Sequence, residues 1–126
     1  MGQSRRVGVS EDIRRFGVNP RLSMAVAHGN TVYLSGQVAI DAGGGPLLEQ
    51  TREVLRRIDD LLAQAGTDRT RLLSVNLYVT DLAALPEINA VWLEWLAGAE
   101  PPCRTTIEAK LASPRYALEI SAVAVI

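Results

Sequence analysis

The amino-acid sequence predicts an α+β fold in which two helices cover one face of a mixed β-sheet, in the order β-β-α-β-α-β-β. Apolar and polar residues alternate along several segments, as in half-buried strands, and two other segments have helical periodicity. The helical segments fall between strands without strict alternation, which favours α+β over a parallel α/β sheet. With 126 residues and 48% apolar content, residues 1–126 suffice for a single domain, with residues 1–19 as an N-terminal extension ordered in part.

The first two strands are predicted as a hairpin over residues 22–35. The alternation is interrupted at Gly29-Asn30, a dipeptide that tolerates the positive φ of a tight two-residue turn. Residues 40–46, Ile-Asp-Ala-Gly-Gly-Gly-Pro, then break the pattern and indicate a flexible loop. A further short strand is expected near residues 6–9.

Two amphipathic helices are predicted from the 3.6-residue periodicity. In residues 47–65 the apolar side chains share one face, charged side chains such as Glu53 fill the other, and Gly66 caps the C-terminus. The second helix begins near Pro86, a residue type favoured in the first turn, and ends by Gly98. Its apolar stripe consists of Ile88, Val91, Trp92 and Trp95.

Three more strands are predicted, at residues 71–81, 104–111 and 117–125. The apolar face of the first consists of Leu73, Val75, Leu77 and Val79. The last two strands are interpreted as a hairpin around residues 112–116, which would place Glu119 opposite residue 109 and about 16 Å from Arg104. A small site that uses both residues would then combine two copies of the chain, and this predicts an oligomer with clefts at its interfaces.

Charge and composition argue against several classes of function. Thirteen basic and fourteen acidic residues give a formal charge of -1 without a basic run, so no nucleic-acid partner is expected. One cysteine and one histidine cannot form an internal disulfide or a Cys/His metal cluster, and no metal is expected. No apolar run approaches the roughly 18 residues of a membrane span, and no signal peptide is evident. We therefore expect a cytoplasmic protein without membrane contact.

The segment 101–108, Pro-Pro-Cys-Arg-Thr-Thr-Ile-Glu, contains two candidates for chemistry. Arg104 begins a strand after a proline pair, where its planar guanidinium could bind a carboxylate through two parallel hydrogen bonds; the alternative is an ordinary surface arginine. Cys103 would need a base to act as a nucleophile, and the sole histidine, His28, lies at the hairpin turn. We therefore favour Arg104 over the cysteine.

Two further candidates lie on strands. Glu119 interrupts an otherwise apolar strand, so it is either at an edge or in a pocket where it could transfer a proton or position a water. Ser35 and Gly36 end the second hairpin strand, and the glycine would let a ligand approach the backbone closely. For both features a purely structural role is the alternative.

The ordered segments VYLSGQVAID, LLAQAG, LLSVNLYVTDL, INAVW, PCRTTIEA and ALEISAVAVI resemble the Rid family of reactive intermediate deaminases, also called YjgF-like or L-PSP endoribonuclease-like proteins, over about residues 20–126. The resemblance implies a chorismate-mutase-like fold and a homotrimer with a central barrel and clefts between subunits. It also implies cofactor-free hydrolysis of enamines and imines, such as 2-aminoacrylate, to a 2-oxo acid and ammonia.

The resemblance also assigns roles to residues. The arginine that holds the substrate carboxylate matches Arg104, and the glutamate associated with the attacking water matches Glu119. The backbone beside the ligand matches Ser35 and Gly36, and Asn89 falls where the family often has an asparagine near the cleft.

Two departures from the family pattern indicate a divergent subgroup. Residues 19–25 read NPRLSMA and lack the family's aromatic residue, and Arg21 there could hold a more acidic ligand. The frequent cysteine two residues after the arginine is Thr106 here. The alternative to a deaminase is a trimer that binds or senses a small carboxylate, such as a 2-oxo acid, without turnover. An endoribonuclease fits a chain of charge -1 poorly.

Overall fold

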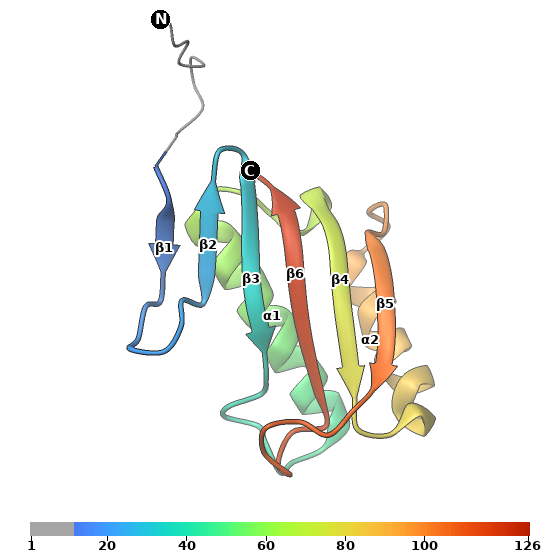
Figure 1. The fold of residues 1–126 in the computed structure, drawn as a ribbon. Helices are drawn as coiled ribbons and strands as arrows, with labels where there is room; N and C mark the ends of the chain where they lie inside the picture. Colours follow the sequence, from blue (N-terminus) through green and yellow to red (C-terminus); the bar gives the residue numbers. More distant parts are fainter. Residues whose placement is uncertain (1–11) are drawn as a thin grey trace, which may run out of the picture.

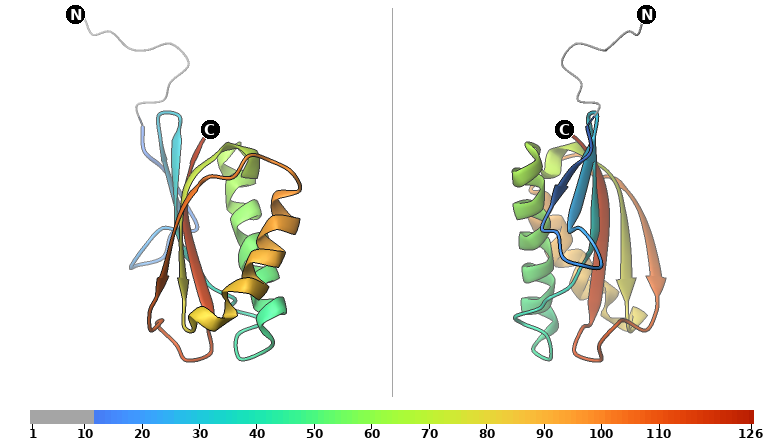
Figure 2. Two further views of the ribbon diagram at one scale, coloured as in Figure 1. Left: turned by 90° about the vertical axis from the view of Figure 1, so that its right-hand side faces the viewer. Right: turned by 60° about the vertical axis from the view of Figure 1, so that its left-hand side comes forward.

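The computed structural model describes residues 12–126, which form one six-stranded sheet covered on one face by two helices (Figures 1 and 2). The predicted α+β class, with both helices on the same side of a mixed sheet, is confirmed. The expected strand at residues 6–9 lies outside the described residues. The strands are β1 (Arg14–Phe16), β2 (Ala25–His28), β3 (Thr31–Gln37), β4 (Leu72–Val79), β5 (Cys103–Glu108) and β6 (Leu118–Val125). The helices are α1 (Leu47–Ala65) and α2 (Leu85–Leu96), with short 3-10 turns η1 (Arg69–Arg71) and η2 (Leu82–Ala84).

The sheet has the strand order β1-β2-β3-β6-β4-β5, with β6 between β3 and β4 (Figure 1). Only β4 and β5 are parallel, and the other neighbouring pairs are antiparallel. The predicted hairpin between β5 and β6 is therefore wrong. After β4, helix α2 returns the chain to the end of the sheet at which β4 began. Strand β5 therefore runs in the same direction as β4 and pairs with it in parallel, as in a β-α-β crossover.

The local predictions that depend on short sequence signals are confirmed. The β2–β3 hairpin pairs His28 with Thr31 around a turn in which Gly29 has a φ of 61°. Helix α1 has the predicted bounds, and Gly66 caps it in the left-handed conformation, donating its N–H to the Ala63 carbonyl at 3.0 Å. Helix α2 has Pro86 in its first turn.

Two features of the strands differ from the prediction. The short strand β1, which pairs with β2, was not predicted, because three residues are too few for an alternation pattern. The buried face of β4 begins with Leu72, whereas Leu73 is 49% exposed. The register with β6 shifts between Leu72 and Ser74, and this irregularity moves the alternation by one residue.

The hydrophobic core lies between the helices and the sheet. Its largest fully buried side chains come from both layers: Leu55, Ile58 and Leu62 of α1, Ile88 of α2, Leu77 of β4, and Leu118 and Ile120 of β6. Along β6 buried residues alternate with half-buried ones, so every second side chain faces away from the helices. We call this second side of the sheet the open face.

Glu53 of α1 is buried, with 2% of its surface exposed, although the periodicity placed it on the solvent face. Its carboxylate accepts the backbone N–H groups of Asp41 (3.1 Å) and Ala42 (2.7 Å) and forms an ion pair with Arg57 at 2.6 Å. The helical periodicity could not show this burial, because the backbone N–H groups that bind the Glu53 carboxylate belong to the loop before the helix. Glu53 thereby fixes a segment that was predicted to be flexible.

The burial of Glu53 predicts an acid-dependent stability. Desolvation acts to raise the pKa of this carboxyl, but the two N–H donors and Arg57 outweigh it, so the pKa lies below its ordinary value. A lowered pKa stabilises the fold above the unfolded-state value of about 4.3, and this contribution is lost as the pH falls through the folded-state pKa.

We expect Glu53→Gln to lower the free energy of unfolding by about 1–3 kcal/mol at pH 7, and the difference from wild type to shrink below about pH 4. Urea unfolding of both proteins at pH 7 and below about pH 4 measures this difference in the free energy of unfolding. Glu49→Gln, an exposed site on the same helix, is the matched control. An equal difference at both pH values would contradict the proposed ionic role.

Candidate functional site

Gly36 and Glu119 meet on the open face of the sheet. Glu119 is half-buried on β6, opposite Tyr78 of β4. A Cβ atom added to Gly36 would lie only 1.9 Å from the Glu119 carboxylate oxygen Oε2. The carboxylate therefore fills the space that a side chain at position 36 would need, which explains why glycine stands there.

Ser35 lies beside this pair and is held by its neighbours. Its hydroxyl donates to the Met24 carbonyl at 3.1 Å, and its backbone N–H donates to the same oxygen at 2.9 Å. The side chain of Gln37, 6% exposed, donates to the Ser35 carbonyl at 3.0 Å. The pairing of β3 with β6 is irregular between Leu34 and Gln37, so the backbone of Ser35 and Gly36 departs from the regular ladder here. Gln37 was not among the site residues predicted from the sequence.

Arg104 lies on the helix-covered face of the sheet, at its edge. It pairs with Val75 of β4, which is buried beneath the helices, and its guanidinium carbon lies 5.5 Å from the ring centroid of Trp92 on α2. Within residues 12–126 the guanidinium forms no hydrogen bond or ion pair. A half-buried arginine placed over an aromatic ring thus keeps its donors available for an added anion.

Asn89 and Thr106 belong to the same side of the molecule as Arg104. Asn89 lies one turn before Trp92 on α2, and its side-chain oxygen Oδ1 is buried without a hydrogen-bond partner among the described residues. Thr106 pairs with the buried Leu77 and therefore shares the face of Arg104, two residues further along β5. A buried acceptor without a donor is uncommon in folded proteins, so Asn89 is suited to accept a hydrogen bond from a bound molecule or water.

The predicted site residues thus form two groups that one chain does not bring together. Ser35, Gly36 and Glu119 lie on the open face of the central strands, whereas Arg104, with Thr106, lies on the helix face of the edge strand β5. The β4 partners of Arg104 and Glu119 are three residues apart, and β4 itself separates the two strands. The Cα atoms of Arg104 and Glu119 are therefore about 14 Å apart, close to the separation that was expected from the incorrect hairpin.

The remaining candidates stand apart from both groups. Arg21 lies in the loop between β1 and β2, where its backbone N–H donates to Asn19 Oδ1 at 2.8 Å and its side chain is exposed. Cys103 is exposed, and its thiol donates to the Leu73 carbonyl at 3.2 Å. Because successive residues of a strand face opposite sides, Cys103 points away from Arg104. His28 is exposed at the end of β2.

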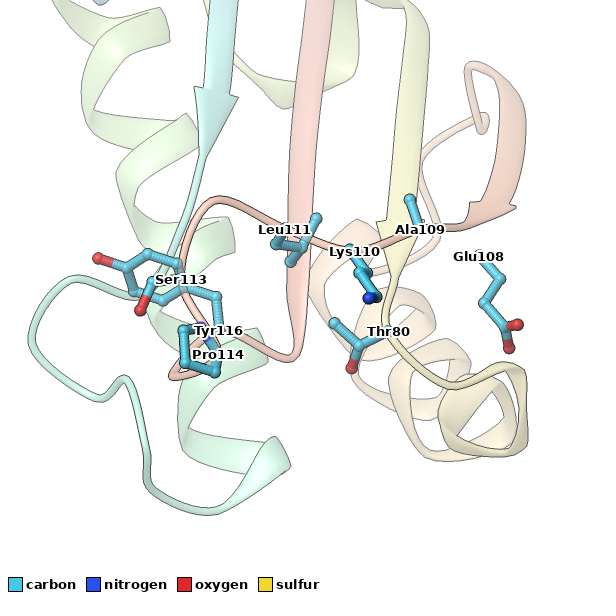
Figure 3. Close-up of a pocket in the computed structure, with 8 residues that line it drawn as sticks. All are labelled: Thr80, Glu108, Ala109, Lys110, Leu111, Ser113, Pro114 and Tyr116. Atoms are coloured by element: carbon cyan, nitrogen blue, oxygen red, sulfur yellow. The ribbon is translucent and has the colours of Figure 1, made fainter.

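A cavity of about 680 Å³ lies beyond the ends of β4 and β5 (Figure 3). Thr80 shares the face of Tyr78, the residue opposite Glu119, so the cavity begins about 7 Å further along the strand. None of the lining residues was predicted as part of a site. The signal available in the sequence was Lys110, the only lysine of the chain. The lining consists of Thr80, Glu108, Ala109, Lys110, Leu111, Ser113, Pro114 and Tyr116.

Residues 12–126 contain neither a cluster of metal ligands nor a helix suited to span a membrane. No group of three or more His, Cys, Asp and Glu side chains in this part of the chain is arranged to hold a metal ion. Neither of its two helices has the length and apolar character needed to cross a membrane.

Comparison with known proteins gives concordant matches. The family model described as Endoribonuclease L-PSP matches residues 13–126. A RutC family protein of Haemophilus influenzae is 38% identical over 112 residues, which cover 89% of this chain and 97% of that protein. The RutC family protein YoaB of Escherichia coli is 31% identical over 115 residues, with 90% and 98% coverage.

A solved structure supports the same assignment. A member of the YjgF protein family from Neisseria meningitidis superposes with a TM-score of 0.85 at 39% identity, covering 91% of this chain and 95% of that one. The family model covers both groups of site residues, and the model and these relatives together confirm the resemblance seen in the sequence. The chain belongs to the L-PSP endoribonuclease family, the family of the YjgF, RutC and Rid proteins.

Proposed function

We propose that this protein hydrolyses small reactive 2-imino and 2-enamino acids, of the 2-aminoacrylate type, to 2-oxo acids and ammonia without a cofactor. The observation that carries the proposal is the half-buried guanidinium of Arg104, which has no hydrogen-bond or ion-pair partner within residues 12–126. Such a group is suited to clamp the carboxylate of a planar substrate. Family membership supports the same activity.

The chemistry needs few groups because the substrate is already reactive. After an enamine has tautomerised to the imine, water adds to the carbon of the C=N bond and a carbinolamine forms. The carbinolamine then expels ammonia as its hydroxyl oxygen becomes the carbonyl oxygen of the 2-oxo acid. Arg104 orients the substrate through its carboxylate, and Glu119 holds the water and passes its proton towards the nitrogen.

We further propose that the working site forms between copies of the chain, in the homotrimer that the family resemblance implies. Three large side chains on the open face support association, since Tyr33, Leu73 and Ile107 are each 45% exposed or more. Exposed apolar groups on one face mark a surface that another protein surface can cover. A second copy that covers this face could place its Arg104 near Glu119.

Mixing two inactive variants tests this arrangement. Arg104→Ala and Glu119→Gln chains are unfolded together and refolded as a mixture, and ammonia release from freshly generated 2-aminoacrylate is measured. If one copy supplies the arginine and its neighbour the glutamate, random assembly of an equal mixture makes about a quarter of the sites intact. We therefore expect about a quarter of wild-type activity.

Each variant refolded alone is the control and is expected to stay inactive. If both residues act within one chain, every site in the mixture carries a defect, and an inactive mixture would contradict the shared site. If the wild-type protein releases no ammonia from 2-imino acids but still binds 2-oxo acids, the hydrolase proposal fails and a binding role replaces it. The RNA cleavage named in the family description is not proposed, because a chain of formal charge -1 has little to attract phosphates.

A further inference from the structure

The cavity beyond β4 and β5 has a single uncommitted charge. Lys110 forms no ion pair with any described residue, and it lines the cavity together with Thr80 (Figure 3). The other charged residue of the lining, Glu108, points away from Lys110 and accepts the backbone N–H of Leu82 at 3.0 Å. A bound anion would therefore find one available cation in the cavity.

The walls of the cavity are held in place at both ends of the segment 109–117. The Ala109 N–H donates to the Val79 carbonyl at 2.9 Å, and the Thr80 N–H donates to the Ala117 carbonyl at 3.1 Å. Gln50, 3% exposed, accepts the Ala117 N–H at 2.9 Å and donates to the Arg115 carbonyl at 3.2 Å. A buried amide that bonds the loop on both sides makes this wall a fixed part of the fold.

The remaining lining combines hydroxyl groups with apolar surface. Thr80, Ser113 and Tyr116 each carry a hydroxyl group, and Leu111 and Pro114 add apolar surface. The Thr80 hydroxyl donates to the Ala117 carbonyl at 3.4 Å, whereas no hydrogen bond among the described residues uses the hydroxyl protons of Ser113 and Tyr116. The lining therefore suits a short carbon chain that ends in an anion, with two hydroxyl donors available to the charge.

We propose that this cavity binds the distal carboxylate of short dicarboxylic 2-imino acids, with Lys110 as its counter-ion. The proposal rests on the proposed function, because it requires that the substrate reacts at Glu119. Along β4, the cavity begins at Thr80, about 7 Å from Tyr78, the residue opposite Glu119. A short dicarboxylate can bridge this span. The cavity then determines specificity: substrates with an acidic side chain are preferred over substrates of equal length without one.

The uniqueness of Lys110 gives a direct binding test on the full chain. Labelling with 15N-lysine yields a single backbone amide signal, which is followed during titration with 2-oxoglutarate or with 2-oxopentanoate, a chain of the same length without the distal carboxylate. We expect saturation at a concentration about tenfold lower for 2-oxoglutarate. Equal half-saturation concentrations, or no shift with either compound, would overturn the proposal.

Substitution of the lysine provides the second measurement. By calorimetry, Lys110→Met should weaken 2-oxoglutarate binding about tenfold and leave 2-oxopentanoate binding unchanged, whereas Lys110→Arg should retain most of the preference. Lys110 is exposed, so neither variant is expected to disturb the fold, which circular dichroism verifies. Equal weakening for both compounds would contradict the role of a distal-carboxylate site.

Kinetics separate the failure of this inference from the failure of the proposed function. If the protein turns over 2-imino acids but Lys110→Met leaves the kcat/KM ratio of the dicarboxylic to the monocarboxylic substrate unchanged, the cavity proposal is wrong and the hydrolase stands. If no imine is turned over while the lysine signal still discriminates between the two oxo acids, the anion site stands without the hydrolase.

Discussion

Replacing Arg104 by alanine is expected to lower kcat/KM for 2-aminoacrylate about a thousandfold, equivalent to about 4 kcal/mol of lost transition-state binding. The guanidinium has no hydrogen-bond or ion-pair partner within residues 12–126, so the substrate carboxylate is expected to use its full capacity for paired hydrogen bonds. Arg104→Lys should lose about tenfold to a hundredfold, because a lysine supplies the charge without the planar pair of donors. Stopped assays of ammonia release measure both variants.

Arg56→Ala, an exposed arginine on α1, is the matched control and should retain wild-type activity. The free energy of unfolding of Arg104→Ala should fall by no more than about 1 kcal/mol, the value of a half-exposed contact with an aromatic ring. A loss of activity that accompanies a much larger loss of stability would point to a structural role for Arg104.

A methyl group at position 36 should have the second-largest effect on activity. In Gly36→Ala the new Cβ would lie 1.9 Å from Oε2 and 2.7 Å from the carboxyl carbon of Glu119, so the carboxylate must rotate away. We expect kcat to fall about tenfold to a hundredfold, since a misplaced proton-transfer group loses most of its contribution. Stability should change little, because the displaced atoms end a flexible side chain.

A double-mutant cycle with Glu119→Ala verifies the cause. Once the carboxylate has been removed, adding Gly36→Ala should lower kcat no further, so the effects of the two substitutions should be strongly non-additive. Additive losses of activity would show that Gly36 acts through its backbone or through another neighbour.

The sequence predicted the parts of the fold that depend on local chemistry. The apolar stripe of residues 47–65 and the Gly66 cap define α1, and Gly29-Asn30 defines the β2–β3 turn, because each signal lies within a few residues of the structure it forms. Pairing between distant segments was not predictable in the same way. Nothing within β5 distinguishes a hairpin partner from the parallel neighbour that the α2 crossover provides.

The residues of the candidate site could be predicted from the sequence, but their arrangement in space could not. Arg104, Glu119 and Gly36 could be named from the resemblance to a family, but the opposite faces of the sheet that they occupy depend on strand order and register. The burial of Glu53 and the cavity at Lys110 depend on loops that fold back onto helix or strand ends, and no periodic pattern records such contacts.

The central position of β6 has a consequence for how the chain folds. The strands β1 to β3 and the pair β4 and β5 are joined in the sheet only through β6, although β6 follows all of them in the sequence. Neither group of strands can complete its backbone hydrogen bonds before β6 has been synthesised and inserted between β3 and β4. Contacts between segments that are distant in the sequence also slow folding. During synthesis the unfinished edges of β3 and β4 would be open to pairing with other chains, so these two edges are where misassembly is expected to begin.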